Sequence, residues 1–217
     1  MIIPLEKRLK KRMHVEIARL QDEVVEILYG IENGLVMHGG TAVWRCYGGN
    51  RFSEDLDFYC RNIGRIEAGL KTKLEERGLM ISKFRKTENL VFCKIENGSV
   101  EVRVEINHSA RKPAKPAIVK PYEKSDGSFM DVLTLSPEDL ILEKIDAYEN
   151  RKFIRDIYDV YHLSNYATQG GLEKLASFVA SEIKAPVDEE NLNAIVYAGK
   201  IPSFNQIVEA LRRRFAV

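Results

Sequence analysis

The stretch that decides the fold is residues 38–58, which read HGGTAVWRCYGGNRFSEDLDF. The apolar triplet at 35–37 comes before it and predicts a short buried strand. A glycine pair, Gly39-Gly40, follows directly, residues 41–47 favour a short helix, and residues 53–60 favour a second strand. The order of strand, glycine turn, helix and strand indicates an α/β fold class.

Two carboxylates in the second strand are the first candidates for chemistry. Asp55 and Asp57 are two residues apart, so both point to one face of a strand, and Leu56 and Phe58 point to the core. Neighbouring carboxylates repel unless water solvates them or they share a cation, and Mg²⁺ prefers one or two carboxylates, water and substrate phosphates. The pair indicates a metal site, with an exposed acidic strand edge as the alternative.

The glycine pair lies between a buried strand and a helix. Backbone N–H groups can approach a phosphate closely there, and the helix N-terminus favours negative charge. A simple tight turn is the alternative for Gly39-Gly40. The spacing lacks the GxGxxG and GxxxxGK[ST] patterns, so it supports neither a Rossmann site nor a P-loop.

A third carboxylate comes from a later strand. Asn97-Gly98 predicts a type I′ hairpin, and residues 100–106 after it alternate between apolar and charged side chains. Glu105 would join the same metals if this strand lies beside the strand of Asp55 and Asp57. Glu101 on the same face competes with it, and an ordinary solvent-facing carboxylate is the alternative.

Apolar periodicity and turn signals predict the remaining elements and two domains. Residues 111–128 contain proline and lysine and are expected to form a connection. The composition changes near residue 135, which predicts an α/β core with an N-terminal helix over 1–135 and a helical domain over 136–217. Helices are expected at 5–29, 64–77, 137–149, 153–166, 171–184, 188–197 and 203–214, and further strands at 79–86, 89–96 and 129–135.

Together these features resemble the nucleotidyltransferase superfamily, and more closely the AbiEii/AbiGii toxin-type nucleotidyltransferases. The resemblance rests on the glycine turn with Thr41 and Ala42, the R-x-S-x-D-x-D strand and the later acidic strand. It continues in the helical half as a pattern L-S-P-E-x-L, K-x-x-A and R-x-x-x-R-D-x-x-D. The matching residues there are Leu135-Ser136-Pro137-Glu138-Asp139-Leu140, Lys144 with Ala147, and Arg151 with Arg155-Asp156-Ile157-Tyr158-Asp159.

The resemblance implies a nucleotidyltransferase fold, which is a mixed sheet flanked by helices and followed by a C-terminal helical region that completes the active site. It implies transfer of NMP from an NTP to an acceptor hydroxyl, such as one on tRNA or another RNA, with release of pyrophosphate. Two Mg²⁺ ions, or Mn²⁺ in their place, would serve as cofactors. The resemblance also implies a toxin whose partner is an antitoxin transcription regulator.

The resemblance gives each matching residue a role. The metal ligands would be Asp55, Asp57 and Glu105. The nucleotide-binding residues would be Gly39, Gly40 and Thr41 around the triphosphate, Ser53 on phosphate, and Arg51 orienting the loop or the nucleotide. Lys144 would neutralise triphosphate charge, and Asp156 would position that lysine or assist the acceptor.

The helical motif also has a plainer interpretation. Lys144 lies on an amphipathic helix and could be an ordinary surface lysine. The spacing of four residues predicts surface ion pairs of Lys152 with Asp156 and of Arg155 with Asp159, in which Asp159 orients Arg155.

Basic residues gather in three further places, at the N-terminus, at Arg212-Arg213-Arg214, and along the proline-broken connection. A solvated loop is the preferred interpretation of the connection, with phosphate contacts as the alternative. Its basic residues are Arg111, Lys112, Lys115, Lys120 and Lys124. The four histidines lack metal-ligand spacing, which excludes a zinc site.

Composition excludes several classes of protein. The 33 Lys and Arg against 32 Asp and Glu give a net charge of +1, so the chain is not a globally basic nucleic-acid coat. No apolar run approaches the roughly 18 residues of a membrane span, and the charged N-terminus does not fit a signal peptide. The three cysteines form no CxxC motif, so neither disulfides nor a zinc ribbon are expected, and we expect a cytoplasmic protein.

Other functions remain open at this point. A non-catalytic nucleotide-binding module would keep the same pocket, and a small-molecule nucleotidyltransferase would share the core and differ only in its acceptor. A phosphotransferase or phosphatase with an aspartyl nucleophile is less favoured, because its acids would end the first strand.

Overall fold

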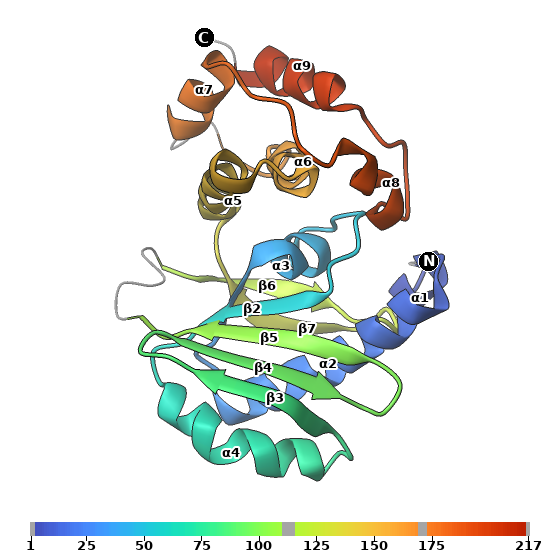
Figure 1. The fold of residues 1–217 in the computed structure, drawn as a ribbon, viewed down its shortest axis with the longest axis vertical. Helices are drawn as coiled ribbons and strands as arrows, with labels where there is room; N and C mark the ends of the chain where they lie inside the picture. Colours follow the sequence, from blue (N-terminus) through green and yellow to red (C-terminus); the bar gives the residue numbers. More distant parts are fainter. Residues whose placement is uncertain (1–2, 110–115, 169–172, 216–217) are drawn as a thin grey trace. The chain divides into compact units, whose positions relative to one another are not determined.

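The computed structural model describes residues 3–109, 116–168 and 173–215, and the chain forms two compact units (Figure 1). The first unit comprises residues 1–48 and 52–135, and the second comprises residues 49–51 and 136–217. The sequence predicted one division, at residue 135. The short segment 49–51 belongs with the helices that follow that point.

A mixed sheet forms the centre of the first unit. Its described strands lie in the order β3-β4-β5-β2-β1-β7-β6, in which β1 is antiparallel to β2 and parallel to β7, while β2 is parallel to β5. This confirms the expected fold class. The strands are β1 (Val36–His38), β2 (Asp55–Tyr59), β3 (Met80–Lys86), β4 (Leu90–Glu96), β5 (Glu101–Asn107), β6 (Ile118–Glu123) and β7 (Phe129–Thr134).

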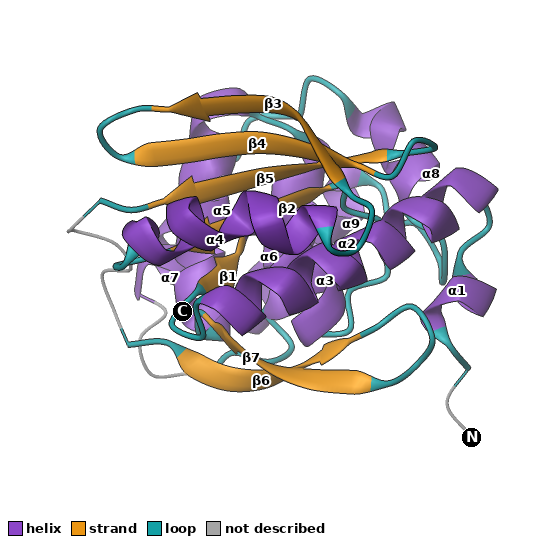
Figure 2. Cartoon of the chain, turned by 90° about the horizontal axis from the view of Figure 1, so that it is seen from below, coloured by secondary structure: helices purple, strands orange, loops and turns teal. Residues whose placement is uncertain are grey.

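Helices cover the apolar face of this sheet. The helices of the first unit are α1 (Leu5–Arg8), α2 (Arg12–Ile31), α3 (Gly39–Cys46) and α4 (Ile63–Glu75). In Figure 2, α2 and α4 lie across the strands, and α2 packs against both β5 and α4. Leu56, Val102, Val104 and Ile106 are almost wholly buried. The alternation predicted for residues 100–106 therefore describes β5 correctly, with its charged side chains on the other face.

The N-terminal helix differs from the prediction. One helix over 5–29 was expected, but Leu9 has extended backbone and separates α1 from α2. Leu9 is buried, while Met13, four residues further along and so on the same face of a continuous helix, is 59% exposed. A backbone hydrogen bond from Glu6 N–H to Ser125 O (2.9 Å) holds α1 against the chain that follows β6. Tertiary contacts of this kind override helical periodicity.

Two loop predictions were also wrong in detail. The β4–β5 hairpin forms, but only Gly98 has positive φ (+84°), whereas a type I′ turn requires positive φ at two successive residues. Asn97 Oδ1 instead accepts from the N–H groups of Ser99 (3.0 Å) and Val100 (3.1 Å). The connection expected over 111–128 contains β6, an edge strand that pairs with β7.

The second unit is helical, as expected. Its α5 begins where the sequence predicted, because Ser136 Oγ accepts from Asp139 N–H (3.1 Å) and Pro137 occupies the first helical position. The described elements are α5 (Pro137–Arg151), α6 (Ile154–Leu163), α7 (Glu173–Ala180), a 3₁₀ turn (Glu189–Asn191), α8 (Leu192–Ile195) and α9 (Phe204–Phe215). Over the described residues of the whole chain, no helix is long and apolar enough to cross a membrane.

Candidate active site

The three predicted metal ligands share one face of the sheet. Asp55 and Asp57 lie on β2, and Glu105 lies on β5, its parallel neighbour. The register pairs Asp57 with Glu105 on one side and with His38 of β1 on the other. All three carboxylates are partly exposed. The structure thus places Asp57 between two strands that each contribute a polar side chain next to it.

The glycine turn lies directly against this carboxylate pair. Gly39 has φ +72°, a conformation that L side chains rarely adopt, and a Cβ atom there would be 2.2 Å from Asp57 Oδ2. Gly39 and Gly40 form the first two residues of α3. Thr41 follows them, is fully buried, and donates its hydroxyl to the backbone oxygen of Asp55 (2.5 Å). The turn and β2 are therefore fixed together.

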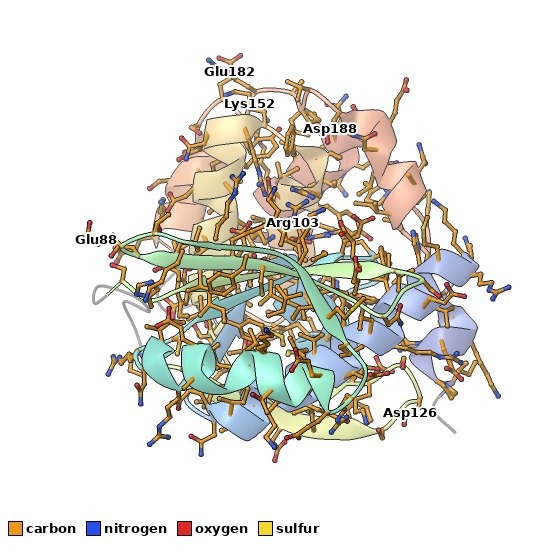
Figure 3. All side chains as sticks on the ribbon, turned by 60° about the horizontal axis from the view of Figure 1, so that its bottom comes forward. Glu88, Arg103, Asp126, Lys152, Glu182 and Asp188 are labelled. Atoms are coloured by element: carbon orange, nitrogen blue, oxygen red, sulfur yellow. The ribbon has the colours of Figure 1, made fainter. Side chains whose placement is uncertain are left out.

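The charges on this face act on one another. Burial raises the pKa of Glu105, and the neighbouring charges of Asp57 and then Asp55 raise it further, while Arg103 and His38 oppose them. Arg103 Nε lies 3.5 Å from Asp55 Oδ1. In Figure 3 Arg103 lies on the side of the sheet away from α4. Sequence analysis did not single Arg103 out, although its position two residues before Glu105 puts it on the same face.

A buried glutamine anchors the segment that enters β2. Gln21 of α2 is fully buried, and its Nε2 donates to the backbone oxygens of Ser53 (2.9 Å) and Glu54 (3.0 Å). Its Oε1 is buried without a hydrogen-bond partner. Gln21 was also missed by sequence analysis. The signal was a glutamine beside Leu20 on the apolar side of a helix.

The metal assignment stays a prediction. Among the residues that the structure describes, no group of three or more His, Cys, Asp and Glu side chains is placed to hold a metal ion. The donor set itself fits, because hard carboxylate oxygens on neighbouring strands are what Mg²⁺ prefers. Burial first, and then the charges of Asp57 and Asp55, raise the pKa of Glu105, and a cation bound there would relieve the repulsion among the carboxylates.

The motif residues of the helical half and Arg51 form a buried ionic network in the second unit. Arg51 makes two hydrogen bonds to Asp159, each 2.5 Å, and Lys144 Nζ lies 2.7 Å from the same carboxylate. Lys144 also lies 3.8 Å from Asp156, to which Arg151 makes two bonds of 2.7 Å. Cations and anions alternate along the network.

This arrangement corrects the predicted ion pairs. Asp159 was expected to orient Arg155 and instead bonds Arg51, while Asp156 was expected to pair with Lys152 and instead bonds Arg151. Both carboxylates are fully buried, so these are not surface pairs. The reason is that a buried, bidentate pair between a guanidinium and a carboxylate is stronger than an exposed pair of residues four apart on a helix.

The network fixes the charge state of Asp159. Burial alone would raise its pKa, but the charges of Arg51 and Lys144, and the hydrogen bonds they donate, lower it overall. Lys144 is itself buried, with its side chain 8% exposed, so it is not the surface lysine of the alternative interpretation. The roles of Arg51, Lys144 and Asp156 toward a nucleotide stay predictions.

Other histidine and lysine side chains have packing or pairing roles. His14 stacks on Phe52, with ring centroids 3.8 Å apart. Lys120 lies over the ring of Tyr47, and Lys124 pairs with Glu26. The remaining basic residues of the connection, Arg111, Lys112 and Lys115, lie outside the described residues.

The first unit has the form of a nucleotidyltransferase core. It is a mixed sheet in which a glycine turn lies against an Asp-x-Asp strand and the next strand carries a third carboxylate. Residues 26–198 match the family model described as nucleotidyl transferase AbiEii toxin, Type IV TA system. Because the match covers most of the chain, the protein belongs to the AbiEii nucleotidyltransferase toxin family. This confirms the resemblance that the motifs indicated.

Solved structures share the fold. A candidate nucleotidyltransferase from H. pylori aligns over 94% of this chain and 93% of its own, with TM-score 0.63 and 18% identity. JHP933 from Helicobacter pylori aligns over 94% and 90%, with TM-score 0.62 and 19% identity. The antibiotic-resistance factor ANT(2'')-Ia covers 75% of this chain and 90% of its own, with TM-score 0.53 and 14% identity. No curated protein matches the chain.

Proposed function

We propose that this protein transfers NMP from an NTP to a hydroxyl of an RNA acceptor such as tRNA, with release of pyrophosphate. One observation carries the proposal. The register of β2 and β5 puts Asp57 beside Glu105, with Asp55 on the same face and the positive-φ Gly39 against Asp57. Carboxylates and a phosphate-accessible backbone turn are the two parts that a nucleotidyl transfer site needs. Family membership supports the same class of reaction.

The chain's own groups would divide the work as follows. Asp55, Asp57 and Glu105 would hold Mg²⁺, which when bound would neutralise phosphate charge and favour ionisation of the acceptor hydroxyl. The backbone at Gly39 and Gly40 would bind the phosphates, because the N-terminus of α3 offers N–H groups and a favourable dipole. Thr41 supports this turn through its bond to Asp55.

The experiment offers the protein each α-labelled NTP in turn with Mg²⁺ and total tRNA. We expect label in RNA from a preferred NTP, and its loss by at least a hundredfold in Asp57→Asn. Glu101→Gln is the matched control, because Glu101 lies on the same strand face but pairs with Lys94. It should keep near-normal transfer.

Each contrary result points to another function. Pyrophosphate release without label in RNA would exclude the RNA acceptor and favour a small-molecule acceptor. NTP binding with no turnover would reject the transferase and leave a nucleotide-binding module. Equal loss in Glu101→Gln and Asp57→Asn would show that charge on this face, and not the Asp57–Glu105 arrangement, is what matters.

We also propose that the activity is toxic and that a transcription-regulator antitoxin restrains it, a role supported by the family description. Induced expression should arrest growth of a bacterial host, and expression of Asp57→Asn at the same level should not. If the Asp57→Asn variant arrested growth as well as the unaltered protein, toxicity would not depend on nucleotidyl transfer.

A further inference from the structure

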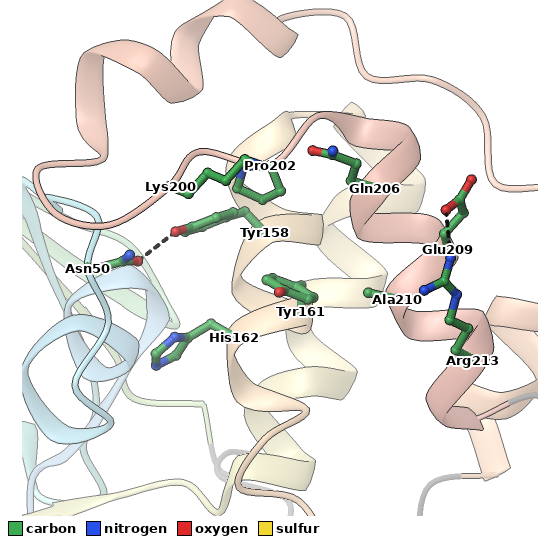
Figure 4. Close-up of a pocket in the computed structure, with 10 residues that line it drawn as sticks. All are labelled: Asn50, Tyr158, Tyr161, His162, Lys200, Pro202, Gln206, Glu209, Ala210 and Arg213. Carbon is green, nitrogen blue, oxygen red and sulfur yellow. Dashed lines mark hydrogen bonds and ion pairs between the residues drawn. The ribbon is translucent and has the colours of Figure 1, made fainter.

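The second unit holds a cavity of about 500 Å³ that the carboxylates and the ionic network do not use. It is formed by α6, α9, Asn50 and the loop that contains Lys200 and Pro202 (Figure 4). A volume of this size is within the range of small-ligand sites. All of its lining comes from one compact unit.

The inner part of the cavity is aromatic and fixed. Tyr158 is 4% exposed and donates its hydroxyl to Asn50 Oδ1 (2.6 Å), and Asn50 Nδ2 donates to the oxygen of Ala198 (2.7 Å). Tyr161 lies beside it with ring centroids 6.4 Å apart and stays partly exposed. The hydrogen bonds hold the ring of Tyr158 in place, while Tyr161 is a partly exposed part of the lining.

Charged, exposed side chains lie at both ends of the cavity (Figure 4). Lys200 comes from the loop and Arg213 from α9. Glu209 is the carboxylate of the lining and pairs with Arg213 at 3.3 Å, with both side chains more than half exposed. An exposed pair of this kind is weak, so the guanidinium can turn to another anion. Two cations against one carboxylate leave a net charge of +1.

We propose that this cavity binds one nucleotide of a single-stranded RNA, with the base against Tyr161 and its two flanking phosphodiesters toward Lys200 and Arg213, which lie at opposite ends of the lining (Figure 4). Bases stack on aromatic side chains, and cations at the rim hold the backbone of a single strand. This inference rests on the proposed function, because the RNA would be the acceptor of that reaction.

The chemistry favours a phosphodiester over an NTP. Each phosphodiester carries one negative charge, which a single cation such as Lys200 or Arg213 can neutralise. A triphosphate carries several charges and usually arrives with a divalent cation. Glu209 would be the lone carboxylate to meet that cation, and the glycine turn is part of the other unit.

Fluorescence anisotropy of a labelled ten-nucleotide single-stranded RNA tests the proposal without any catalytic step. Tyr161→Ala should weaken binding about tenfold, whereas Tyr161→Phe, which keeps the stacking surface, should bind nearly as well as the parent. Lys200→Glu should weaken binding and lower the slope of log affinity against log salt by about one. Lys184→Glu changes an exposed loop lysine of the same unit outside the cavity and is the matched control.

The arms separate the possible outcomes. Unchanged RNA affinity in both Tyr161→Ala and Lys200→Glu would overturn the proposal, and so would an equal loss in Lys184→Glu. Weakened NTP binding with unchanged RNA binding would assign the cavity to the donor and overturn it as well. If the unaltered protein bound RNA in this cavity but transferred no label from any NTP, the proposed function would be rejected and this inference would stand.

Discussion

Gly39 lies so close to Asp57 that adding one carbon atom, a Cβ, is expected to disturb the site. An alanine at Gly39 would need positive φ and would place its Cβ 2.2 Å from a carboxylate oxygen. We expect Gly39→Ala to lower the free energy of unfolding by about 1–3 kcal/mol and to remove transfer activity, because Asp57 or the turn must move. Urea denaturation and the labelled-NTP assay measure the two effects.

Gly30→Ala is the control for this prediction. Gly30 lies in α2, and a Cβ atom there would meet nothing within 4 Å. Alanine is the better helix former, so this variant should be equally stable or more stable by up to about 1 kcal/mol. If Gly39→Ala were as stable and active as Gly30→Ala, the close approach to Asp57 would have no role.

Glu105 gives a prediction about pH. Its folded pKa is raised above the ordinary value of 4.5, so the folded state holds its proton more tightly than the unfolded state. Ionisation of Glu105 therefore destabilises the folded state at pH values above 4.5. It has no effect well below pH 4.5, where the carboxyl is protonated in both states. Glu105→Gln should raise the melting temperature at pH 7 by roughly 1–2 °C without divalent ions, and should leave it unchanged near pH 4.

Mg²⁺ provides the second readout for Glu105. If the carboxylates hold the ion, adding it should stabilise the parent more than Glu105→Gln and so close the gap between them. A gap that is independent of both pH and Mg²⁺ would contradict the account of repulsion among Glu105, Asp57 and Asp55.

At this scale the sequence predicted the polar face but not every contact on it. Asp55, Asp57 and Glu105 were predictable because strand periodicity assigns a face without knowledge of partners. Gln21 and Arg103 were not singled out, because a hydrogen bond across 32 residues or a neighbour in the sheet register leaves no local pattern.

At the scale of helices and strands, residue spacing alone predicted the wrong partners for the buried network of α5 and α6. Helical spacing favoured Arg155 for Asp159, but the actual partner, Arg51, is 108 residues away along the chain. Likewise, β6 was taken for a connection because it contains Pro121. Proline is tolerated on an edge strand, where its missing N–H faces away from the ladder.

Removing one member of this network should be costly. Asp159→Asn removes the buried carboxylate that binds both Arg51 and Lys144, and leaves Asp156 as the remaining carboxylate of the described network, so we expect a loss of about 3–5 kcal/mol in the free energy of unfolding. Asp146→Asn on α5, which breaks an exposed pair with Lys174 of α7, should change stability by less than about 0.5 kcal/mol. Chemical denaturation compares the two.

The pH dependence tests the same charge. The folded pKa of Asp159 is lowered, so its contribution is present above the ordinary value of 3.8 and is lost only as the pH falls through the lower folded value. The difference between the parent and Asp159→Asn should stay constant from pH 5 to pH 8. A difference that disappears within that range would show that Asp159 is not held ionised by Arg51 and Lys144.

The whole molecule is divided in space differently from the way it is divided along the chain. The change in amino-acid composition predicted a boundary at residue 135. Segment 49–51 joins the second unit through hydrogen bonds that composition cannot reveal: Asn50 bonds Tyr158 and Ala198, and Tyr197 Oη donates to Gly49 O (2.9 Å). Arg51 adds an isolated bridge to Val196 and the two bonds to Asp159.

A fragment of residues 136–217 should therefore fail to fold as the helical unit does in the whole chain. It would bury Lys144 with Asp159 and Asp156 but lack Arg51, and Tyr158 would lose its acceptor on Asn50. We expect weak helical circular dichroism and no cooperative urea transition. If the fragment, which lacks segment 49–51, unfolded in urea as cooperatively as the full chain, this segment would not stabilise the helical unit.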